Sequence, residues 1–181
     1  IIAGFFLMSN TYNDSFLNQI LSEFINGNKI ESFNKLKKFI EKNPKDYTAK
    51  YNFGYMSQQL NKEDLAIHYY KEVISKNKNH WQSRNNLYLI YLAKQLYLPA
   101  LKLVNEVLKI KENYQPAHRD KALILNYLKK PDEALKYIQL SIKQNPVDYI
   151  ALNTLGLILL SLKKYIEAEK TFLEAIRINS K

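Results

Sequence analysis

The chain has 181 residues, of which 46% are hydrophobic and only four are Gly and five Pro, a composition typical of a folded chain and not of a disordered one. It contains no Cys, which excludes disulfides and thiolate metal sites and leaves the redox compartment open. The net charge of +10 comes mainly from Lys, and it indicates either acidic partners or a solvated outer face.

Residues 1–12 form an apolar N-terminal segment, and the first eight of them carry no charge. Eight residues are too few to cross a bilayer, which needs about 20. The segment is therefore interpreted in one of two ways. It is either the remnant of a membrane anchor that lies upstream of residue 1, or a helix that packs on the first repeat. Localisation stays open between cytoplasmic and membrane-anchored.

From residue 13 onward the apolar residues recur at the spacing of amphipathic helices. Residues 13–46 show the weakest pattern, with Phe16, Ile20 and Phe24 before the turn at Gly27-Asn28 and a second apolar stripe after it. Residues 47–80, 81–114, 115–148 and 149–181 repeat the arrangement, and the last is the clearest. The sequence thus predicts five helix pairs, none of which can bury its apolar face alone.

The five segments align at one constant period, without insertion or deletion. All five prolines fall between units or in the first turn of a predicted helix, where Pro is tolerated. Position 20, counted from the first residue of each unit, carries a small residue, as a close helix approach requires: Ser32, Ala66, Ala100, Ala134 and Ala168.

This pattern resembles the tetratricopeptide repeat (TPR) family, whose units are helix–turn–helix pairs of about 34 residues. The resemblance covers nearly the whole chain. It implies an all-α fold, a right-handed α-solenoid of five repeats in which residues 13–181 form one domain. The unit at residues 115–148 departs from the family pattern, because His118 stands at position 4 and Lys121 at position 7, which is normally apolar. Residues 149–181 match best, through Leu155, Gly156, Tyr165, Ala168, Phe172 and Ala175.

The resemblance further implies that the first helices line a concave groove that binds a peptide segment of a partner. Asn offers a donor and an acceptor to a peptide group, and Tyr offers rigid apolar area with a polar tip. The alternative is that these side chains only solvate the inner helix face. The family's groove positions carry over to Tyr51, Asn52, Tyr55, Asn85, Asn86, Leu89, Arg119, Asp120, Asn126, Tyr127 and Asn153, with Asn52, Tyr55, Asn85, Asn86, Arg119 and Asn126 as the principal contacts.

One known TPR subtype, which clamps the acidic C-terminal tail of heat-shock chaperones, is not supported. The clamp positions hold Tyr51, Tyr55, Asn86, Pro116 and Asp120, and only Asn86 matches the subtype. A chaperone tail is therefore not the expected partner.

Catalysis finds little support. His68, His80 and His118 stand in different units without the spaced partner of a zinc helix, and the chain has no Gly-rich phosphate loop. We expect a non-enzymatic scaffold for protein–protein interaction that has no cofactor and no metal.

The rival hypothesis is a basic-surface module for nucleic acid or anionic membrane. The Lys residues fall mostly on predicted second helices and turns, outside the groove, which favours membrane proximity over nucleic acid. A further hypothesis concerns the C-terminal end, where Leu173, Ile176 and Ile178 lack a predicted polar capping helix. That end either self-associates weakly or is covered by further sequence.

Overall fold

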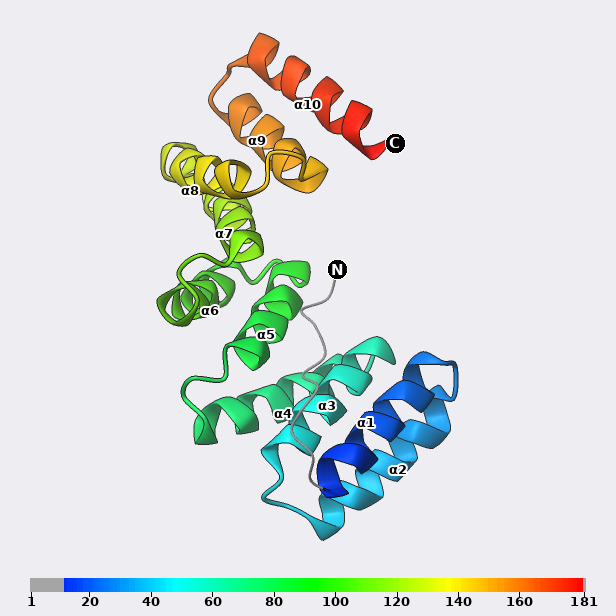
Figure 1. Cartoon of the computed structure of the whole chain (residues 1–181). Coiled ribbons are helices and arrows are strands. Elements are labelled where there is room, and N and C mark those ends of the chain that lie inside the picture. The colour runs from blue at the N-terminus through cyan, green and yellow to red at the C-terminus, as the bar shows by residue number, and fades with distance from the viewer. Residues whose placement is uncertain (1–11, 181) are drawn as a thin grey trace. The chain divides into compact units, whose positions relative to one another are not determined.

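The structure is a computed structural model that describes the backbone of residues 12–180 and the side chains of residues 15–180. The apolar segment at residues 1–11 lies outside the described residues, so neither interpretation of it is tested. Within residues 12–180 the chain forms helices and no strand, as predicted (Figure 1). The helices are α1 (Tyr12–Ile25), α2 (Lys29–Lys42), α3 (Tyr47–Gln59), α4 (Glu63–Lys76), α5 (Trp81–Ala93), α6 (Tyr97–Ile110), α7 (Gln115–Tyr127), α8 (Pro131–Gln144), α9 (Tyr149–Ser161) and α10 (Tyr165–Asn179).

The period of the sequence reappears in the helix starts. The first helices α3, α5, α7 and α9 begin at Tyr47, Trp81, Gln115 and Tyr149, the first residues of the four units that the sequence defines. Within the pairs α1–α2, α3–α4, α7–α8 and α9–α10 the two helices pack side by side (Figure 1). The all-helical fold of successive helix pairs that the sequence predicts is confirmed.

The turns inside the pairs share one backbone conformation. Each turn has a residue of positive φ at the same position of its unit. The φ angle is between 56° and 62° at Asn61, Gln95, Lys129 and Lys163, and it is 109° at Gly27. The amide that follows each of these residues donates to a carbonyl five residues back, as Lys62 N does to Ser57 O at 2.8 Å. This is the Schellman arrangement, in which a left-handed residue ends a helix and satisfies its last carbonyls. It reverses the chain into the second helix.

Small residues allow the two helices of a pair to approach closely. The predicted position-20 residues have no exposed surface: Ser32, Ala66, Ala100, Ala134 and Ala168. The backbone at Gly156 also lies close to the second helix of its pair, because a Cβ atom at that position would lie 2.4 Å from Cε1 of Phe172. Larger side chains at these positions would separate the helices and lose apolar contact.

The helices divide into two compact units, one up to Ile90 and one from Tyr91 onward, and the division falls within α5. The core of the first unit includes Phe33 and Phe53, whose rings stack with centroids 4.4 Å apart. The core of the second unit includes Leu125 and Ile138. No helix among residues 12–180 combines the length and the hydropathy that a bilayer span requires.

Candidate functional site

The predicted groove residues lie on the first helices of both units, and each unit holds its own set. In the first unit α3 carries Tyr51, Asn52 and Tyr55, and α5 carries Asn85, Asn86 and Leu89. In the second unit α7 carries Arg119, Asp120, Asn126 and Tyr127, and α9 carries Asn153. Within each set, some residues are buried in polar networks and others keep accessible surface.

A buried hydrogen-bond network joins three helices of the first unit. The side-chain amide of Asn86, which is only 2% exposed, donates to Oη of Tyr70 on α4 at 3.1 Å and to Oη of Tyr51 at 3.4 Å. The Tyr70 hydroxyl in turn donates to Oε1 of Gln58 on α3 at 3.0 Å. Burial raises the pKa of Tyr70 well above its usual range, and the hydrogen bond from Asn86 opposes that effect only in part. The phenol therefore stays protonated and keeps its donor.

This network gives several predicted contacts a role inside the protein. Tyr51 and Asn86 are buried members of it, and Asn85 donates to Oδ1 of Asn86 at 3.4 Å. Asn52 is also buried, whereas Tyr55 and Leu89 are only partly buried. In the first unit these last two offer the largest share of accessible groove surface among the predicted residues.

An ion-pair network plays the corresponding role in the second unit. Arg119 donates from Nε to Oδ1 of Asp120 at 2.9 Å and from Nη1 to Oδ2 of Asp148 at 3.2 Å. Asp148 precedes α9, and its other oxygen accepts from the amides of Ile150 and Ala151, which caps the helix. Arg119 on α7 is thereby tied to the start of α9.

The environment of Asp148 shifts its titration. Burial acts to raise the pKa of its carboxyl, but three hydrogen-bond donors and a cation outweigh burial and hold the pKa below its usual value. Those groups are the Gln115 side chain, the two capping amides and the Arg119 guanidinium. The sequence predicts Arg119 as a groove residue, but no local pattern identifies Asp148 as its partner or Gln115 as a second donor to Asp148.

Three predicted residues of the second unit keep accessible surface outside the ion-pair network, and we call them the α7–α9 surface: Asn126, Tyr127 and Asn153. Tyr127 is 45% exposed and stacks on Tyr97, with ring centroids 4.9 Å apart. Asn153 is exposed, and Asn126 is partly exposed. Oδ1 of Asn126 has no hydrogen-bond partner among residues 15–180, and it is itself buried. α7 and α9 pack against each other, so the three side chains belong to neighbouring first helices.

Metal-ligating side chains do not gather in the described part of the chain. Within it, no three His, Asp or Glu residues lie in an arrangement that could hold a metal ion.

The family comparison matches two parts of the chain, residues 47–80 and residues 119–181, and both matching families are described as tetratricopeptide repeat. Together they cover more than half of the chain. No curated protein matches the sequence.

Several solved structures share the fold. A MamA RS-1 double mutant superposes with a TM-score of 0.83 at 16% identity, covering 96% of this chain and 97% of that chain. A MamA fragment (41-end) from Desulfovibrio magneticus RS-1 gives 0.83 at 15% identity, covering 95% and 98%. A crystal structure of MamA gives 0.79 at 15% identity, covering 96% and 97%. At these identities the likeness concerns the fold.

The lowered pKa of Asp148 predicts a pH-dependent contribution to stability. Because the folded pKa lies below the unfolded value of about 3.9, the contribution is present above about pH 4 and is lost as the pH falls through the folded pKa. The Asp148→Asn side chain can still cap α9 but does not titrate. We therefore expect the free energy of unfolding of this variant to decrease less steeply than that of the wild type as the pH falls below about 4. Urea unfolding followed by circular dichroism at a series of pH values measures this.

Asp132→Asn is the matched control, since Asp132 is an exposed carboxylate in the first turn of α8. It should leave the pH profile unchanged. An Asp148→Asn profile as steep as the wild-type profile would contradict the assignment.

Proposed function

The chain belongs to the tetratricopeptide repeat family, and we propose that it is a non-enzymatic protein-interaction scaffold that binds a peptide segment of a partner along its first helices. The observation that carries this proposal is the α7–α9 surface. Tyr127 and Asn153 present accessible area, and the buried Oδ1 of Asn126 lacks a donor among residues 15–180. A buried acceptor without a donor costs free energy, and a peptide N–H would supply that donor.

The predicted groove residues then divide into two roles. Tyr55 and Leu89 in the first unit, and separately the α7–α9 surface in the second unit, are available for contact with a peptide, because they keep accessible area. Tyr51, Asn86 and Arg119 do not contact the peptide but hold the first helices in position through hydrogen bonds and ion pairs to neighbouring elements. Exposed Tyr suits such an interface, since a rigid ring buries much area at little entropic cost.

Exposed lysines supply the basis for the rival function. Lys71, Lys102, Lys136, Lys143 and Lys170 lie on second helices and keep accessible surface. Such a surface would attract nucleic acid or anionic lipid through long-range charge, and that attraction would weaken steeply with salt. A peptide bound on the first helices by amide and aromatic contacts would depend much less on salt. The two functions are therefore separable in one binding experiment.

We expect the double variant Tyr127→Ala, Asn153→Ala to lose a partner protein that the wild type retains from nuclease-treated lysate of the source cell. Truncating an aromatic contact at the centre of an interface weakens binding by about tenfold or more. Calorimetric titration with the purified partner, at low and high salt, gives the affinity. Circular dichroism confirms that the variant is folded.

The double variant Lys136→Ala, Lys143→Ala is the control, because both lysines lie on α8, outside the predicted groove. It should bind the partner as the wild type does. Equal binding by the α7–α9 variant, or loss of binding by the lysine variant alone, would refute the proposed peptide surface.

A second interaction is proposed for an exposed apolar stripe of α10. Ile166, Leu173 and Ile176 are 72%, 60% and 63% exposed, and their spacing places them on one stripe of the helix. An exposed apolar stripe of this kind is typical of an interaction surface. We propose that it mediates weak self-association.

Sedimentation velocity over a range of protein concentrations should show a rising average mass for the wild type. Leu173→Glu should abolish the rise, because association would bury the new charge. Leu98→Glu, at an equally exposed apolar residue on α6, should leave it unchanged. A wild type that stays monomeric at every concentration would refute self-association.

A further inference from the structure

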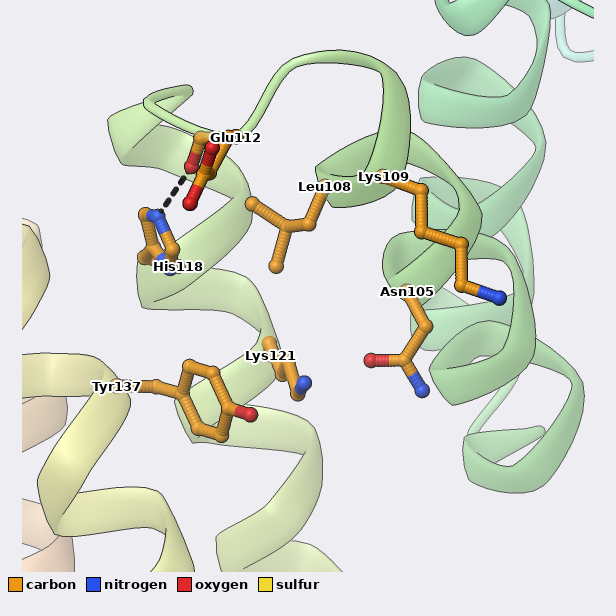
Figure 2. A pocket seen from close by; sticks show the side chains of 7 residues that line it. All are labelled: Asn105, Leu108, Lys109, Glu112, His118, Lys121 and Tyr137. Atoms are coloured by element: carbon orange, nitrogen blue, oxygen red, sulfur yellow. Dashed lines mark hydrogen bonds between the residues drawn. The ribbon is translucent and has the colours of Figure 1, made fainter.

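We propose that a pocket between α6, α7 and α8 is a second peptide site, which binds one acidic residue of an extended segment. The pocket has a volume of about 510 Å³ and lies in the second unit (Figure 2). It includes the two residues at which this repeat departs from the family pattern, His118 and Lys121. Its lining consists of Asn105, Leu108, Lys109, Glu112, His118, Lys121 and Tyr137.

Two buried acceptors in this lining lack a donor. Nε2 of His118 lies 2.7 Å from the backbone oxygen of Glu112, as the dashed line in Figure 2 marks. A carbonyl oxygen can only accept, so Nε2 carries the hydrogen, and the Nε2–H tautomer leaves Nδ1 as an acceptor. Neither Nδ1 of His118 nor Oδ1 of Asn105 has a hydrogen-bond partner among residues 15–180. The His118 residue is only 8% exposed, so little water can reach it. An N–H group of a ligand would give the two acceptors the hydrogen bonds that they lack.

A cation lies in the same pocket. The Lys121 ammonium sits 3.8 Å from the ring centre of Tyr137, in a cation–π contact. Among residues 15–180 no carboxylate lies within ion-pair distance of it. Figure 2 shows Lys121 and Tyr137 together on one side of the pocket and Glu112 beside His118 at the other end. The Lys121 end therefore favours a carboxylate.

An acidic residue within a peptide meets both demands at once. Its side-chain carboxylate pairs with Lys121, and backbone N–H groups on either side of it reach the acceptors of His118 and Asn105. A bare anion would leave the acceptors unpaired, and a cationic ligand would be repelled by Lys121. The net charge of +10 also favours an acidic partner during encounter. This site does not depend on the α7–α9 surface.

The test is an NMR titration of ¹⁵N-labelled protein with N-acetyl-glutamate N-methylamide, which carries one carboxylate and two amide N–H groups. Saturable shifts should appear at the backbone amides of Asn105, His118 and Lys121. N-acetyl-glutamine N-methylamide and acetate should each bind at least about tenfold more weakly, because each lacks one half of the recognised chemistry. This comparison of probes uses only the wild-type chain.

Lys121→Leu removes the ammonium and places an apolar residue where the family pattern has one, so the variant should fold. It should bind the probe at least about tenfold more weakly than the wild type. Lys102→Leu, at an exposed lysine of α6 that does not line the pocket, should bind as the wild type does. Equal binding of acetate, undiminished binding by Lys121→Leu, or shifts confined to other residues would each overturn the proposal.

Discussion

The hydroxyl of Tyr70 has no exposed surface, so its hydrogen-bond partners must come from within the protein. Leaving such a group unpaired would cost about 1–3 kcal/mol, which is a large part of the stability of a small domain. Asn86 and Gln58 meet this demand from α5 and α3. A polar residue that pairs with the buried Tyr70 hydroxyl is itself withdrawn from the surface. The need to pair this hydroxyl therefore determines which polar residues of the first helices can contact a ligand.

The second unit meets a similar requirement with charges. Arg119 reaches across to Asp148, which caps α9, so that one guanidinium links the side of α7 to the start of the next first helix. Both networks fix the spacing of first helices, and the small residues buried inside each pair fix the spacing between first and second helices. A peptide surface on the first helices would then be largely preformed, which reduces the entropy lost on binding.

The fold could be predicted from the sequence because its determinants are local and repeated. A fully buried small residue at position 20 and a left-handed turn residue recur from one unit to the next, and each acts within its own helix pair. The site could be predicted only in outline. Asn86 stands at a groove position, but whether its amide meets a ligand or a phenol depends on Tyr70, which lies on another helix. The sequence shows Lys121 as a departure from the family pattern, but the pocket around it forms only when three helices are in place.

Asn86 acts inside the protein through its hydrogen bond to Tyr70, and a double-mutant cycle measures that interaction. The free energies of unfolding of the wild type, Asn86→Leu, Tyr70→Phe and the double variant give the coupling between the two side chains. We expect each single variant to be destabilised and the coupling to be about 1 kcal/mol or more. Additive effects, with a coupling near zero, would contradict this role of the Asn86–Tyr70 hydrogen bond. Asn86 would then be available to bind a ligand.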